Sequence, residues 1–118
     1  MAEVTVGSGL FAADTICTDL RAKTKDEAIK EMVDLLYDAG VVTDKAVFTQ
    51  VIYDREALSS TGMGMGFAIP HGRSEVVTGP RVAVGLSKAG LDFNAPDGTL
   101  ANMVFMIAIS PKENNLHL

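Results

Sequence analysis

The sequence lacks the residues that mark several common classes of protein. It has one cysteine, Cys17, no tryptophan, and no cluster of lysines or arginines to offset its net charge of −5. A lone cysteine cannot close an internal disulfide bond, and a nucleic-acid-binding surface usually shows a basic stripe. The composition therefore excludes a fold held by internal disulfides and argues against a nucleic-acid partner.

Long apolar runs are also missing. No run approaches the roughly 18 residues that a membrane-spanning helix needs. The first 20 residues contain Glu3 but no lysine or arginine, whereas a secretory signal starts with basic residues. We therefore expect a cytoplasmic protein, and the length of 118 residues predicts one domain with a single core.

Helical signals are clear in two segments. In residues 24–39, Thr24 and Glu27 form a capping box, and Gly40 ends the pattern. Thr43 is the expected N-cap of a second helix, which should end near Leu58. The apolar positions predicted to face the core are Ile29, Met32, Val33 and Leu36 in the first helix and Val47, Phe48, Val51 and Ile52 in the second.

Strand signals are shorter. Residues 15–20, 67–69 and 81–87 read as strands, and 59–66 reads as a glycine-rich loop. Residues 102–109 are almost wholly apolar, which predicts burial on both faces of a central strand. Asp97-Gly98 marks a turn. Helices mixed with short buried strands predict an α/β sandwich.

The stretch "GMGMGFAIPHGR", residues 62–73, places one of only two histidines after a glycine-rich loop. A dinucleotide-binding loop needs G-x-G-x-x-G before a helix, and a Walker loop needs Gly-Lys-Ser/Thr. Neither is present, because the spacing is G-x-G-x-G and a strand pattern follows. The glycines therefore predict a turn without bulky side chains that lets another group come close.

His71 itself has a structural and a catalytic interpretation. A lone histidine is often only structural, but this one follows a strand, and α/β sites gather where strands end. The sequence has no cysteine or acid cluster beside it for a metal and no G-x-S-x-G elbow for a serine triad. A neutral imidazole is abundant near pH 7, which leaves His71 as a candidate nucleophile.

These residues carry a resemblance. "STGMGMGFAIPHGR" resembles the active-site signature of the enzyme IIA domains of the bacterial sugar phosphotransferase system, fructose–mannitol type, whose fructose branch reads S-T-G-x-G-x-G-x-A-x-P-H. The likeness continues through "RVAVGLS", "DFNAPDG" and "VFMIAIS" to "NNLHL". It implies an α/β fold with a mixed β-sheet flanked by helices on both faces. It also implies a single domain over residues 1–118 that stops before its C-terminal helices.

The resemblance assigns roles to single residues. His71 matches the histidine that accepts a phosphoryl group from a phosphohistidine carrier protein and passes it to a cysteine of an enzyme IIB. His117 matches a second histidine that hydrogen-bonds the phosphate, and Arg55 matches an arginine near the site. A membrane permease is an indirect partner only, and no cofactor or metal is implied.

The loop chemistry adds further expectations. Thr61, Gly62, Gly64 and Gly66 would offer a hydroxyl and backbone N–H groups to the phosphate. For Arg55, a pair on the helix surface is the competing interpretation. Relatives usually have Asn or Glu where this chain has Met65, so a polar contact is lost there, or the methionines at 63 and 65 form an apolar rim for docking.

Three functions are compatible with these features. The leading one is a phosphocarrier in the uptake of a sugar that the sequence does not name. The second is a regulatory phosphoacceptor of the same fold that moves no sugar. The third is a binding module without transfer, which the presence of both His71 and His117 disfavours.

Overall fold

The structure, a computed structural model, describes residues 10–111. Two helices and six strands follow a short 3-10 turn, η2, at Ala13–Thr15. They are β1 (Ile16–Cys17), α1 (Lys25–Asp38), α2 (Lys45–Leu58), β2 (Gly62–Gly64), β3 (Phe67–Ala68), β4 (His71–Arg73), β5 (Arg81–Leu91) and β6 (Ala101–Ile109). In this part of the chain, no helix is long and apolar enough to cross a membrane.

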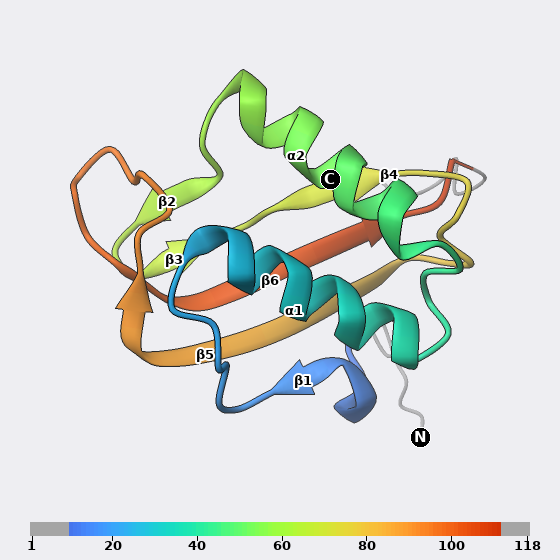
Figure 1. The fold of residues 1–118 in the computed structure, drawn as a ribbon. Helices are drawn as coiled ribbons and strands as arrows, with labels where there is room; N and C mark the ends of the chain where they lie inside the picture. The colour runs from blue at the N-terminus through green and yellow to red at the C-terminus, as the bar shows by residue number, and fades with distance from the viewer. Residues whose placement is uncertain (1–9, 112–118) are drawn as a thin grey trace.

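The strands form one mixed sheet, as expected. Its order is β1-β5-β6-β3-β2, and β4 pairs with β6 farther along that strand than β3 does. The long strands β5 and β6 are antiparallel, whereas β1 is parallel to β5 and both β3 and β4 are parallel to β6. Figure 1 shows α1 and α2 lying side by side over one face of this sheet. The α/β fold is therefore confirmed.

The two faces of β6 differ in burial. Val104, Met106 and Ala108 are fully buried, and they pair with residues of β4 and β5 that contact the helices. On the opposite face, Met103 and Ile107 in the middle of the strand are only half-buried, whereas Ile109 at its end is buried. The expectation that both faces are covered therefore holds for one face of the described residues. Helices on the opposite face remain a prediction.

The α1 prediction is confirmed at both ends. Thr24 caps it by accepting from the Glu27 N–H at 3.1 Å, and the Glu27 carboxylate accepts from the Lys23 N–H at 2.8 Å. The helix ends at Asp38, and Gly40 follows with φ +80°. All four of its predicted core residues, Ile29, Met32, Val33 and Leu36, are buried.

In α2 the predicted cap is wrong by one residue. Asp44, not Thr43, accepts from the Val47 N–H at 3.1 Å, because the Thr43 hydroxyl donates to the Val76 carbonyl instead. The helix does end at Leu58. Phe48 and Ile52 are buried as predicted, but Val47 is 43% exposed, since the helix contacts the core mainly through the other two.

Strand bounds also depart from the sequence predictions. Gly62–Gly64 is strand β2 of a hairpin with β3, although 59–66 was expected to be a loop. His71 follows strand β3, as expected, but it is itself the first residue of a further strand, β4, and β5 runs on to Leu91. The turn at Asp97-Gly98 is confirmed by the Gly98 N–H bond to the Ala95 carbonyl at 3.0 Å.

Gly72 lets α2 approach β4. A Cβ at this position would lie 2.8 Å from Val51 Cγ1 and 3.2 Å from Ile52 Cδ1. Because Val51 is β-branched and stiff, we expect Gly72→Ala to lower the free energy of unfolding by about 1–3 kcal/mol. Denaturant unfolding measures this, with Gly79→Ala as control, since a Cβ there meets no atom within 4 Å. Equal stability of the two variants would contradict the packing.

Candidate functional site

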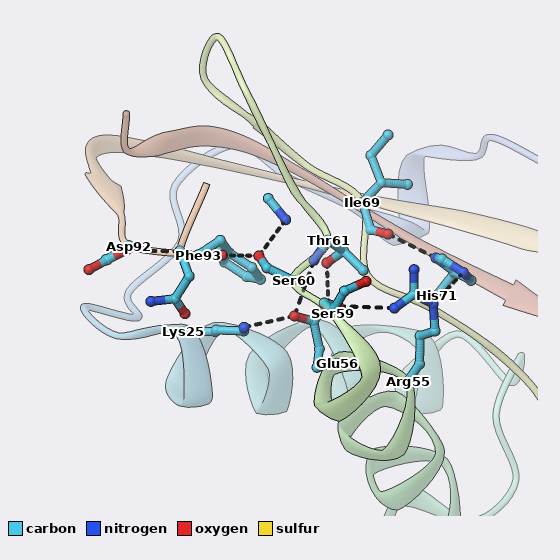
Figure 2. Close-up of polar contacts among 12 residues, drawn as sticks. Lys25, Arg55, Glu56, Ser59, Ser60, Thr61, Ile69, His71, Asp92 and Phe93 are labelled. Carbon is cyan, nitrogen blue, oxygen red and sulfur yellow. Dashed lines mark hydrogen bonds and ion pairs between the residues drawn. The ribbon is translucent and has the colours of Figure 1, made fainter. Parts of the chain in front are cut away.

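His71 is held by hydrogen bonds to both ring nitrogens. Its Nδ1 lies 3.0 Å from the Ile69 carbonyl oxygen, and the Arg55 Nε–H donates to its Nε2 at 3.3 Å. A carbonyl only accepts and a guanidinium only donates, so the bonds require a proton on Nδ1 and a lone pair on Nε2. Figure 2 shows both contacts. The two bonds therefore fit the Nδ1–H tautomer, with the lone-pair nitrogen Nε2 turned toward a cation.

Arg55 comes from the last turn of α2. Besides His71, its guanidinium donates through Nη1 to the Ser59 carbonyl oxygen at 3.0 Å. A cation at a helix C-terminus also interacts favourably with the helix dipole. The competing interpretation was a pair on the helix surface, but the side-chain contacts of Arg55 are with His71 and the Ser59 carbonyl, and the neighbouring Asp54 accepts from Gln50 at 2.8 Å. The fold thus brings together His71 and Arg55, two of the residues that the resemblance assigns to the site.

The loop after α2 is hydrogen-bonded to neighbouring parts of the protein. The Thr61 hydroxyl and N–H both donate to the Glu56 carboxylate, the latter at 3.3 Å, and Thr61 is buried. The Ser60 hydroxyl donates to the Phe93 carbonyl oxygen and accepts from the Gly62 N–H at 2.9 Å. The hydroxyl and N–H of Thr61 and the N–H of Gly62 were expected to bind a phosphate. In the structure they are hydrogen-bonded to Glu56 and Ser60 instead.

Gly64 and Gly66 lie at the turn of the β2–β3 hairpin. Their φ angles are +86° and +90°, and Met65 between them has φ +56°, so three successive residues are left-handed. The Met65 N–H donates to Asp97 Oδ2 at 3.1 Å. The side chains of Met63 and Met65 are 61% and 85% exposed. The hairpin turn thus presents methionines, and not a polar group, to solvent.

Asp97 anchors this turn through its ionised form. The N–H and hydroxyl of Thr99 and the N–H of Met65 hold its pKa below the usual 3.8. These bonds favour the charged carboxylate, so their contribution to stability is complete above the usual value and is lost as pH falls through the lowered one.

We therefore expect Asp97→Asn to reduce the melting temperature at neutral pH by an amount that shrinks as the pH falls below 3.8. Melting curves of both proteins across this range measure the effect. A difference in melting temperature that stays constant with pH would contradict the linkage.

Glu56 is a functional candidate that the sequence reasoning missed. Its side chain is only 5% exposed and forms an ion pair with Lys25 Nζ at 2.7 Å. Lys25 Nζ also lies 5.4 Å from the centre of the Phe93 ring. Lys25 is 31 positions earlier in the chain, so the local residue spacing does not predict the Lys25–Glu56 pair. Its only sequence signal is a glutamate directly after Arg55 at a helix end.

The remaining expectations concern His117 and a possible metal site. His117 lies outside the described residues. Within residues 10–111, no group of three or more metal-ligating side chains occurs. The described part of the chain has no enclosed pocket either, and His71 is a half-buried residue of strand β4, which pairs only with β6 in the sheet.

Comparison with known proteins gives the family. Residues 9–118 match the model of the phosphoenolpyruvate-dependent sugar phosphotransferase system, EIIA 2. The chain is 42% identical over 109 residues to the fructose-specific EIIABC component of Bacillus subtilis (strain 168), covering 92% of this chain and 17% of that protein.

Solved structures agree. Nitrogen regulatory protein IIA-Ntr from Neisseria meningitidis matches with a TM-score of 0.80 and 29% identity, over 91% of this chain and 72% of that one. The enzyme IIA of the mannitol system of Escherichia coli, solved in complex with phosphorylated enzyme IIB, matches with a TM-score of 0.75 and 28% identity, over 87% and 72%. The chain belongs to the EIIA 2 family of the sugar phosphotransferase system.

Proposed function

We propose that this chain is a phosphocarrier in sugar uptake. His71 accepts a phosphoryl group from a phosphohistidine carrier protein and passes it to a cysteine of a cognate enzyme IIB. The observation that carries the proposal is the pairing of the Nε2 lone pair of His71 with the Arg55 guanidinium. Family membership and the E. coli relative's complex with phosphorylated enzyme IIB support it. A cytoplasmic location belongs to the same proposal.

The accepting step needs no proton transfer at the nucleophile. The Nε2 lone pair attacks the phosphorus of the incoming phosphohistidine, a new N–P bond forms, and the donor's N–P bond breaks. The electron pair of the broken bond returns to the donor imidazole. Nδ1 keeps its proton throughout because the Nδ1–H donates a hydrogen bond to the Ile69 carbonyl oxygen at 3.0 Å. The step is an in-line transfer between two imidazoles.

Arg55 changes partner during this step. Its Nε–H occupies the lone pair in the resting site, so the guanidinium must release Nε2 as the phosphorus arrives. It then donates to the phosphoryl oxygens, which carry close to two negative charges. Charge stabilisation of this kind is the protein's main contribution to phosphoryl transfer. The bond from Nη1 to Ser59 keeps the guanidinium at the site meanwhile.

The second step reverses the roles. A cysteine thiolate of enzyme IIB attacks the phosphorus on His71, an S–P bond forms, and the N–P bond breaks. The electron pair returns to Nε2, and Arg55 donates to the lone pair again. The exposed methionines at 63 and 65 would give both protein partners an apolar rim to dock on, and thioethers adapt to differently shaped surfaces.

The remaining assigned residues keep their roles as part of this proposal. His117 would donate a hydrogen bond to the phosphate, as the resemblance implies. Gly64 and Gly66 would offer backbone N–H groups to the phosphate, and Gly62, whose N–H is bonded to Ser60, would with them keep the loop free of bulky side chains for a partner's approach. For Thr61 to donate to a phosphate, its hydroxyl would first have to leave Glu56.

A regulatory phosphoacceptor remains the second candidate, because the nitrogen regulatory IIA-Ntr of N. meningitidis has a TM-score of 0.80 to this chain. Transfer onward separates the two functions, since only a carrier passes its phosphate to enzyme IIB. The name of the B. subtilis relative makes a fructose enzyme IIB the first one to test.

The experiment is phosphorylation followed by discharge. The protein is incubated with phosphoenolpyruvate, enzyme I and the carrier protein, and its intact mass is measured before and after addition of a fructose enzyme IIB. We expect one acid-labile phosphoryl group that disappears on mixing. A stable phosphorylated form in the presence of several enzymes IIB would favour the regulatory function, and no phosphorylation at all would contradict both.

A further inference from the structure

The buried carboxylate of Glu56 forms an ion pair with the partly buried Lys25 beside the site, and neither is hydrogen-bonded to His71. The Glu56 side chain is 5% exposed and that of Lys25 is 22% exposed. The carboxylate accepts from Lys25 and from both donors of Thr61. A buried charge with this many partners is costly to assemble, and replacing it by apolar residues is often no less stable. The pair therefore calls for a role besides stability.

A chain of hydrogen bonds leads from this pair to the nucleophile. Glu56 accepts from the Thr61 N–H at 3.3 Å, and the Thr61 carbonyl accepts from the Ile69 N–H at 2.9 Å. The Ile69 carbonyl in turn accepts from His71 Nδ1 at 3.0 Å. Figure 2 shows the two ends of this chain, the contacts among Lys25, Glu56 and Thr61 and the contact between Ile69 and His71.

We propose that Glu56, held by Lys25, is a positioning residue that fixes the tautomer of His71. The carboxylate holds the Thr61 N–H, the Thr61 carbonyl holds the Ile69 N–H, and the Ile69 carbonyl holds the proton on Nδ1. Nε2 is thereby kept as the lone-pair nitrogen that faces Arg55. This inference rests on the proposed function, because it explains which nitrogen of His71 reacts.

The carboxylate suits this role better than a neutral group would. Hydrogen bonds to an ionised acceptor are about twice as strong as neutral ones, and one carboxylate can accept from Thr61 twice while also pairing with Lys25. A glutamine at 56 would keep the shape but lose the charge, and its amide would face the Lys25 ammonium. The backbone of Thr61 would then be held less tightly, and the backbone of Ile69 with it.

The test compares Glu56→Gln with Glu31→Gln. Glu31 is a matched control, because its carboxylate also accepts backbone N–H bonds, from Arg21 and Ala22, but far from the site along the chain. The first readout is nitrogen-15 NMR of the His71 ring at about pH 8, where a histidine is neutral. Signals are assigned by their absence in His71→Gln. The second readout is the rate of phosphoryl acceptance.

We expect the Nδ1–H tautomer to dominate in the wild type and in Glu31→Gln. In Glu56→Gln the Nε2–H tautomer should appear, and acceptance should be about tenfold slower, the difference between a charged and a neutral hydrogen bond. A merely structural role would lower the melting temperature without changing the tautomer. An unchanged tautomer and rate in a folded Glu56→Gln protein would overturn the inference.

A lysine pair makes the test independent of how Glu56→Gln folds. Lys25 and Lys45 each open a helix, pair with an acid and lie over an aromatic ring. Lys45 is on the surface, with 49% of its side chain exposed. Lys25→Met should change the tautomer and Lys45→Met should not, and the same result for both would count against the inference.

The inference and the proposed function fail in different ways. If the wild-type protein accepts no phosphate, the proposed function falls, while the tautomer readout still tests Glu56. If the wild-type protein is phosphorylated but Glu56→Gln and Lys25→Met keep the wild-type tautomer and rate, only the positioning role of Glu56 falls.

Discussion

Replacing His71 with glutamine is expected to abolish phosphorylation entirely. Glutamine can still bond to Arg55, but its amide has no lone-pair nitrogen that attacks phosphorus. The side chain is half-buried on an edge strand, so the fold should survive and the melting temperature should change little. Intact-mass measurement after incubation with phosphoenolpyruvate, enzyme I and the carrier protein gives the result.

His117→Gln is the matched control for this experiment, since it removes the other histidine of the chain. As a hydrogen-bond donor and not the carrier, His117 should be dispensable for acceptance while speeding transfer to enzyme IIB. Phosphorylation of the His71→Gln protein to the wild-type level would contradict the assignment of the nucleophile.

Removing the Arg55 guanidinium should give the second-largest effect. Loss of one preorganised donor to a developing oxyanion typically costs about 10²–10³ in rate, and Arg55→Ala should slow acceptance by that factor. Arg55→Lys should recover only part of it, because an ammonium is a point charge that cannot donate to Ser59 and the phosphoryl group in the same forked geometry.

Rapid-quench measurement of phosphoryl acceptance gives these rates. Arg81→Ala is the control, because Arg81 pairs with Asp14 at 2.8 Å and makes no contact with His71. Its rate should match the wild type. If Arg55→Ala accepts phosphate as fast as Arg81→Ala does, the guanidinium at His71 has only a structural role.

Local signals in the sequence predicted the helices well. The Thr24 cap and the apolar spacing of α1 were confirmed because both depend on residues a few positions apart. The cap of α2 could not be decided in the same way. Thr43 and Asp44 are both good caps, and a bond from Thr43 to Val76, 33 positions later, decides between them.

Strand predictions failed where a segment is a strand because it pairs with another strand and not because of its own residue pattern. Gly62–Gly64 carries no strand signal, yet it pairs with β3 in a hairpin. His71–Arg73 is a strand because β6 supplies partners from Ile107 to Ile109. Such pairing depends on contacts that are distant in sequence, so periodicity in one segment cannot reveal it.

The candidate site also combines residues that could be assigned from the sequence with contacts that could not. His71 and Arg55 were assigned by resemblance, and the fold brings them to 3.3 Å across 16 positions of the chain. The role of Thr61 was not foreseeable, because its donors are taken by Glu56, whose burial depends on Lys25 from another helix. The sequence alone does not show that the Thr61 hydroxyl already has a hydrogen-bond partner, because that partner is defined by the fold.

One measurement tests most directly whether Nε2 of His71 carries the phosphoryl group. The nitrogen-15-labelled protein is phosphorylated with phosphoenolpyruvate, enzyme I and the carrier protein, and the coupling between nitrogen-15 and phosphorus-31 is recorded in its histidine rings. We predict coupling to Nε2 of His71, with the proton retained on Nδ1. Coupling to Nδ1 of His71, or to a nitrogen of His117, would contradict this assignment.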